Sequence, residues 1–71
     1  MLKVQRRYNA DLWRVLTNES EDTTIVVNIY EIKAISIYQI ERCENGELTE
    51  CIAVNGSTNA LEIAFNMLKE Y

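Results

Sequence analysis

The Asn45-Gly46 pair is the feature that most constrains the fold, because it lies between two stretches rich in β-branched and aromatic residues. Both central residues of a type I′ turn need a positive φ, which Asn and Gly reach at the least cost. The flanking stretches, residues 33–43 and 48–54, have the composition of pleated strands. We therefore predict one antiparallel hairpin over residues 33–54, with Asn45 and Gly46 as its loop.

A two-residue loop also predicts the register of the hairpin. The expected cross-strand pairs are Glu44 with Glu47, Cys43 with Leu48, and Tyr38 with Ala53. Side chains alternate between faces along a strand, so this register puts Cys43 and Cys51 on opposite faces of the hairpin. Because a disulfide needs Cβ atoms about 4 Å apart, we expect two reduced thiols.

Three further stretches of the chain have the pattern of strands. Residues 2–8 alternate between apolar and polar side chains, and residues 23–32 are a nearly continuous β-branched run typical of a central strand. Residues 12–17 alternate again, with Trp13 and Val15 on one side. A helical turn over residues 10–17, capped by Asn9, is the alternative, because Leu12 and Leu16 are also four residues apart.

The connections are expected at polar or irregular stretches. Residues 9–11 are typical of a tight turn, and residues 18–22 are typical of a polar surface loop. The connection between the central strand and the hairpin is expected around residues 30–34, as a short helical turn or a bulge.

A helix is expected to begin near Thr58 or Asn59, with Asn59 and Glu62 forming a variant of the capping box. The polar residues of this segment fall on one stripe when plotted on a helix: Asn59, Glu62, Asn66, Lys69 and Glu70. The remaining side chains are apolar over an arc of about 200°, which is more than one sheet can cover.

The chain is therefore predicted to be a single small α+β domain over residues 1–71: an antiparallel meander of four strands, or five, with one C-terminal helix packed on a face. Hydrophobic residues make up 48% of the sequence, which is enough for a core. Neither a membrane-spanning run nor a signal peptide is found, so the cytoplasm is the expected location.

Catalytic and ligand-binding patterns are not found in the sequence. There is no His, the three serines have no base at a motif spacing, and the two glycines stand alone. Glu41 and Glu50, expected to face each other across the hairpin, are more typical of a solvated sheet edge than of an acid/base pair. We expect no enzyme activity, no metal site and no cofactor.

The excess of apolar surface predicts association. Contiguous exposed apolar patches usually mark an interface, and a two-fold dimer is the commonest way to cover one. We expect a homodimer or a larger oligomer that acts through protein–protein contacts, with itself and with an unidentified protein. The candidate interface residues lie on the helix: Ile63, Met67 and Tyr71.

A single-stranded nucleic-acid-binding module is the alternative function. The first 14 residues have a net charge of +3, while the whole chain has −4. They combine cations with aromatic rings suited to base stacking: Lys3, Arg6, Arg7 and Arg14 with Tyr8 and Trp13. Strand alternation would divide this patch between two faces, and pairing of the cations with acids of the chain or of a partner subunit is the favoured interpretation. Arg6, Arg7 and Trp13 are the candidate contacts.

From Thr23 onward, the order of elements resembles in outline that of the flagellar FlbD-like proteins. The shared features are the Glu-Ile-x-x-Ile spacing from Glu31 to Ile35, the Asn-Gly turn and the terminal helix. The first 22 residues are not part of this resemblance, and it implies no function for this chain.

Overall fold

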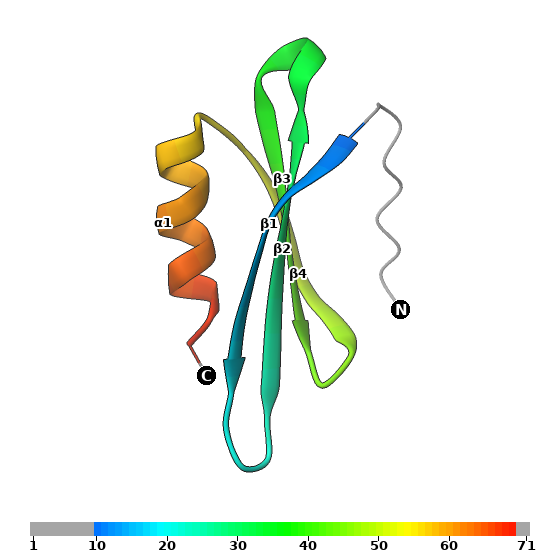
Figure 1. Ribbon diagram of the computed structural model, residues 1–71, viewed down its shortest axis with the longest axis vertical. Helices are drawn as coiled ribbons and strands as arrows, with labels where there is room; N and C mark the ends of the chain where they lie inside the picture. The colour runs from blue at the N-terminus through cyan, green and yellow to red at the C-terminus, as the bar shows by residue number, and fades with distance from the viewer. Residues whose placement is uncertain (1–9, 70–71) are drawn as a thin grey trace.

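The computed structural model describes residues 10–69, which form a four-stranded antiparallel sheet with one helix on a face (Figure 1). The elements follow in the order β1 (Ala10–Glu19), β2 (Thr24–Ile32), the 3-10 turn η1 (Lys33–Ile35), β3 (Ile37–Glu44), β4 (Glu47–Asn55) and α1 (Ser57–Met67). The strands are neighbours in the same order. The predicted α+β meander is confirmed; a fifth strand is not found within residues 10–69, and the predicted strand at residues 2–8 lies outside them.

β1 settles the choice between strand and helix for residues 10–17, since the whole segment is extended. The predicted tight turn at residues 9–11 is wrong for Ala10 and Asp11, which pair with Ile32 and Glu31 of β2. The strand also runs further than expected at its other end, through Glu19. The loop to β2 is therefore short.

The Asn45-Gly46 turn forms as predicted, with φ of 50° and 84° at its two residues. Asn45 also makes two hydrogen bonds to the start of β2. Its backbone N–H donates to the Thr24 carbonyl at 2.8 Å, and its side-chain oxygen accepts from the Thr24 N–H at 2.9 Å. The turn thus joins the β3–β4 hairpin to β2 as well as reversing the chain.

A β-bulge changes the register of the hairpin beyond its first two pairs. Glu44 pairs with Glu47 and Cys43 with Leu48, as expected, but the register then shifts between Arg42 and Cys43. Thr49 is the extra residue, and from there Tyr38 pairs with Val54 instead of Ala53.

The same bulge overturns the predicted placement of the cysteines. Cys51 pairs with Glu41, and Glu41 shares a face with Cys43 because the two are two residues apart on one strand. Cys43 and Cys51 therefore lie on the same face of the sheet. Both are free and half-buried.

The core lies between β2, β3 and α1. Ile25, Val27 and Ile29 alternate along β2 and are fully buried, which confirms the predicted central strand. The buried residues of the helix are Ala60, Ala64 and Met67, of which the two alanines are small. Small residues there let the helix approach the sheet closely.

The helix begins earlier than expected, at Ser57. Gly56 precedes it with a φ of 86° and no side chain caps the first turn. The predicted capping role of Asn59 is wrong, because Asn59 lies inside the first turn and its amide donates to the Asn55 carbonyl at 3.1 Å. The positive φ of Gly56 supplies the change of direction from β4 into α1.

The end of the helix is held by a buried arginine. Arg42 of β3 is 1% exposed, and its Nε donates to the Met67 carbonyl at 2.7 Å while its Nη2 donates to the Lys69 carbonyl at 3.1 Å. Nη1 and Nη2 also donate to Thr49 Oγ1 at 2.7 Å and to the Glu44 carboxylate at 2.9 Å. The last carbonyls of a helix lack partners within it and carry partial negative charge, so a guanidinium there supplies both donors and charge.

Replacing Arg42 by alanine is expected to lower the free energy of unfolding by about 3 kcal/mol, because two carbonyls lose their donors and a cavity is left. Urea unfolding followed by circular dichroism measures this. The matched control is Arg14→Ala, an exposed arginine whose loss is expected to cost less than about 1 kcal/mol. Equal effects of the two substitutions would contradict this role of Arg42.

Candidate interaction surface

The helix covers only part of the sheet. α1 packs on β2, β3 and β4 and leaves β1 at the edge (Figure 1). A helix is about 10 Å wide with its side chains and adjacent strands lie about 4.8 Å apart, so one helix covers two or three strands of four. The side of β1 that faces the helix layer is consequently covered only in part.

A second bulge decides which side chains β1 presents to that side. The register between β1 and β2 shifts between Leu12 and Arg14, which makes Trp13 the extra residue. Arg14 pairs with Ile29, a core residue, and Trp13 packs against the same core. Both therefore lie on the helix side, which corrects the predicted pairing of Trp13 with Val15 on one face.

Trp13 lies between an arginine and a tyrosine. The Arg14 guanidinium carbon is 4.7 Å from the centre of the Trp13 ring, and the ring centres of Trp13 and Tyr38 are 4.9 Å apart. Tyr38 in turn donates from its hydroxyl to the Glu31 carboxylate at 2.9 Å. That hydrogen bond, followed by desolvation and by the charge of Glu31, raises the pKa of Tyr38 above its ordinary value.

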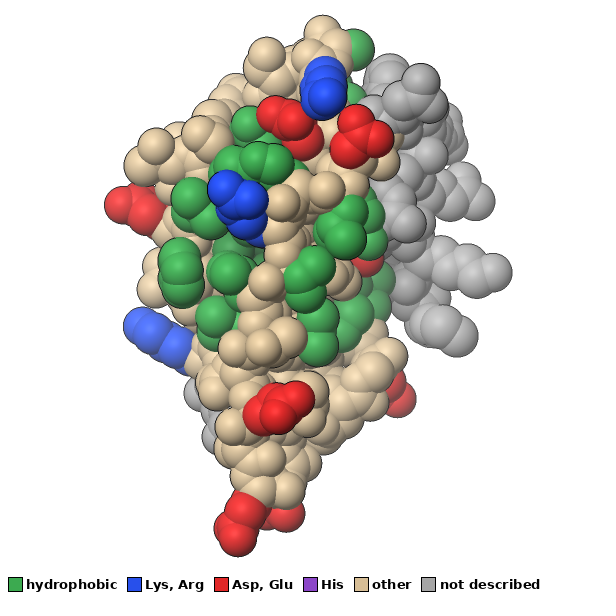
Figure 2. Space-filling view, viewed as in Figure 1, with side chains coloured by type: hydrophobic (Ala, Val, Ile, Leu, Met, Phe, Trp, Pro, Cys, Tyr) green, Lys and Arg blue, Asp and Glu red, His purple; other side chains and the backbone are tan. Residues whose placement is uncertain are grey.

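Apolar side chains of α1 and β1 together form the α1–β1 surface, defined by Trp13, Leu16, Leu61, Phe65 and Leu68. Figure 2 shows hydrophobic side chains gathered over these two elements. Phe65 is 58% exposed, whereas the other four are half-buried at the margin of the core. The Asn18 amide of β1 donates to the Leu68 carbonyl at 2.7 Å, which ties the strand to the end of the helix.

The opposite face of the sheet is more mixed. Leu12 and Val15 are exposed there, at 56% and 49%. They share the face with polar side chains of β2 and β3, namely Asn28, Gln39 and Glu41. Val26, Tyr30 and Ile32 of β2 lie on this face as well, so apolar and polar side chains alternate with one another across it.

The predicted interface residues are placed differently from one another. Met67 is 3% exposed and lies in the core with Ala60 and Ala64, which takes its side chain out of any surface. Ile63 is half-buried against the same core, and Tyr71 lies outside the described residues. The exposed aromatic of the helix is instead Phe65, which borders the polar stripe of the sequence.

The candidate nucleic-acid residues are only partly described. Arg6 and Arg7 lie outside residues 10–69. Trp13 is half-buried, and its ring is used in contacts with Tyr38 and Arg14. These contacts compete with base stacking, but the nucleic-acid alternative stays a prediction; it requires retention on single-stranded oligonucleotides that falls with added salt.

The Cys43 thiol lies in surroundings opposite to those of an activated cysteine. Burial, followed by the nearby charge of Glu41, raises the pKa of the Cys43 thiol, whereas an activated thiol needs a lowered pKa. Residues 10–69 contain no group of three or more side chains able to hold a metal ion. None of the helical segments in this range has the length and hydropathy of a membrane span.

Comparisons of the chain with family models, with curated proteins and with solved structures find no match. The inference about function therefore depends on the surface itself.

The Tyr38–Glu31 hydrogen bond is expected to make stability fall at alkaline pH. A tyrosine whose pKa is raised by folding loses its proton first in the unfolded state, so this contribution is complete below about pH 10 and is lost as the pH rises through the folded pKa. Urea unfolding at several alkaline pH values measures the slope. Tyr38→Phe is expected to reduce it, while Tyr30→Phe, on the other face, leaves it in place; an unchanged slope for Tyr38→Phe would contradict the assignment.

Proposed function

We propose that this chain is a small non-catalytic interaction protein that acts through protein–protein contacts as a homo-oligomer, with the α1–β1 surface as its contact. The observation that carries this proposal is Phe65, which is 58% exposed on α1 beside a row of half-buried apolar side chains. Burying such a side chain in a partner contributes about 1.5–3 kcal/mol.

The surface has the composition of an interface centre with a polar margin. Aromatic residues are over-represented among the side chains that dominate binding energy, and polar groups commonly surround them. Here the aromatic residues Trp13 and Phe65 are accompanied by the exposed polar side chains of Arg14, Asn18 and Glu62. This arrangement favours a protein surface as partner over a small ligand.

A second copy of the chain is the simplest partner. A 71-residue chain buries a smaller fraction of its surface than a large domain, and closed two-fold dimers are the commonest oligomers. The free thiols of Cys43 and Cys51 are typical of a reducing compartment, which supports the cytoplasm as the proposed location. A further protein partner would bind the assembled oligomer.

Sedimentation equilibrium at tens of micromolar is expected to give the mass of a dimer or larger species, and Phe65→Glu is expected to give the monomer mass. A buried carboxylate at the centre of an apolar contact is strongly unfavourable. Leu12→Glu is the matched control, because Leu12 is as exposed as Phe65 but lies on the opposite face of the sheet; its mass is expected to equal that of the parent. A monomeric parent protein would contradict the proposed function.

A further inference from the structure

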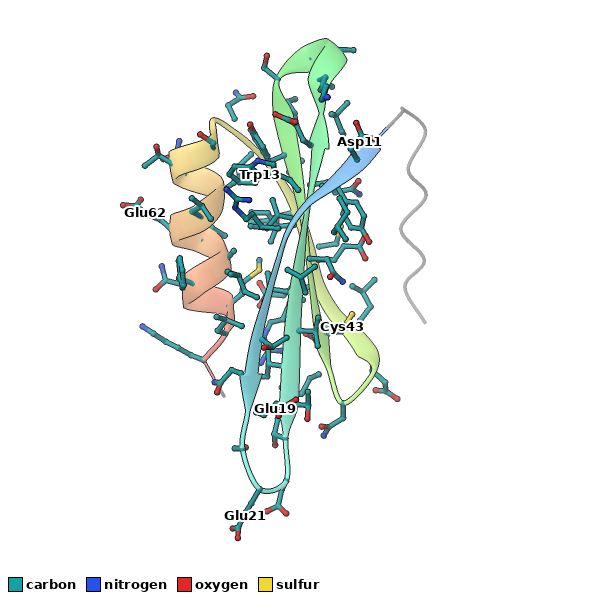
Figure 3. All side chains as sticks on the ribbon, viewed as in Figure 1. Asp11, Trp13, Glu19, Glu21, Cys43 and Glu62 are labelled. Carbon is teal, nitrogen blue, oxygen red and sulfur yellow. The ribbon has the colours of Figure 1, made fainter. Side chains whose placement is uncertain are left out.

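Two opposite charges lie at either end of the helix row that contains Phe65. Glu62 lies on α1 and Lys69 lies two residues past its end; the two are seven residues apart, which is close to two helical turns and corresponds to the same side of the helix. Both are exposed, and Figure 3 shows Glu62 pointing away from the sheet. Phe65 falls between them along the helix axis.

Lys69 is fixed in place although it follows the last residue of α1. The Leu68 N–H donates to the Phe65 carbonyl and the Lys69 N–H to the Asn66 carbonyl, both at 3.3 Å, so the final turn continues past Met67. The Lys69 carbonyl also accepts from Arg42 Nη2 at 3.1 Å. The backbone that carries this cation is therefore held against the sheet.

We propose that a second copy of the chain occupies the α1–β1 surface, with the two α1 helices antiparallel about a two-fold axis that passes between Phe65 and Asn66. Glu62 of each copy then faces Lys69 of the other, and the two Phe65 side chains meet at the centre beside the apolar residues of β1. This inference rests on the proposed function and deepens it, because it names both the partner and the geometry.

Charge complementarity selects this arrangement. A two-fold axis relates each contact to a second contact between the same two positions, so a single Glu62–Lys69 pairing occurs twice. A parallel alignment would instead place Glu62 against Glu62 and Lys69 against Lys69. Exposed charge pairs at the margin of an interface set its orientation and register, while the apolar centre supplies the affinity.

Two charge reversals test the geometry directly. Glu62→Lys alone places two ammonium groups opposite each other, and Lys69→Glu alone places two carboxylates opposite each other, so each variant is expected to dimerise about tenfold more weakly than the parent. Mixing the two variants in equal amounts is expected to restore dimerisation through a heterodimer. In it the two reversed side chains face each other with opposite charge, and so do the native Lys69 of one chain and the native Glu62 of the other. Sedimentation at matched concentration and low salt measures the dimerisation of both single variants and of their mixture. The double variant Glu62→Lys/Lys69→Glu is measured in the same way. Both of its pairs are again of opposite charge, so it is expected to dimerise with the parent affinity.

The matched control is Glu21→Lys, the same reversal in the β1–β2 loop, away from α1 (Figure 3); it is expected to leave dimerisation unchanged. Urea unfolding of each variant checks that the fold is retained. The antiparallel arrangement is overturned if the double variant fails to restore the dimer, or if both single reversals leave it intact.

Failure of this inference can be separated from failure of the proposed function. If Phe65→Glu dissociates the oligomer while the charge reversals have no effect, the surface is correct and the arrangement of the helices is wrong. If the parent protein is a monomer at tens of micromolar, both the arrangement and the proposed function fail.

Carbodiimide coupling of Glu62 to Lys69, mapped by mass spectrometry on a mixture of isotopically labelled and unlabelled chains, gives an independent measurement of the same contact.

Discussion

The hydrogen bonds of the Arg42 guanidinium are the interaction on which the rest of this structure depends. A buried charge is strongly unfavourable unless it is paired and hydrogen-bonded, and this one donates to two helix carbonyls, a hydroxyl and the Glu44 carboxylate. No buried side-chain polar atom within residues 10–69 lacks a partner. α1 faces the sheet mainly with Ala60, Ala64 and Met67, and these hydrogen bonds, together with that from the Asn18 amide to the Leu68 carbonyl, attach its C-terminal end to the sheet.

The two β-bulges explain how a regular meander acquires its special contacts. The bulge at Thr49 brings that hydroxyl to Arg42, where it accepts from Nη1 and donates to the Arg42 carbonyl at 3.2 Å. The bulge at Trp13 turns two consecutive side chains, Trp13 and Arg14, to the same side of β1. Bulges are common where a sheet must redirect a side chain, and here one supports the helix while the other builds the candidate surface.

Local signals account for what could be predicted from the sequence. The Asn45-Gly46 turn follows from backbone sterics, and the buried row of Ile25, Val27 and Ile29 follows from strand alternation, so the meander and its central strand were predictable. The bulges were not, because an extra residue leaves no mark in the composition. The burial of Met67 and the exposure of Phe65 depend on the position of the helix over the sheet, which periodicity alone does not determine. The role of Arg42 could not be predicted, because it donates to backbone carbonyls about 25 residues away in the sequence.

Lys69 connects the interior of the fold to its outer surface. Its carbonyl accepts from Arg42 inside the protein, while the residue itself is exposed and follows Glu62 by seven positions. Loss of the Arg42 bonds would therefore free the last turn of the helix and, with it, the position of this charge relative to Phe65. It follows that the proposed contact between copies depends on Arg42, which is buried. Association through α1 requires a chain in which the end of this helix is already held against the sheet.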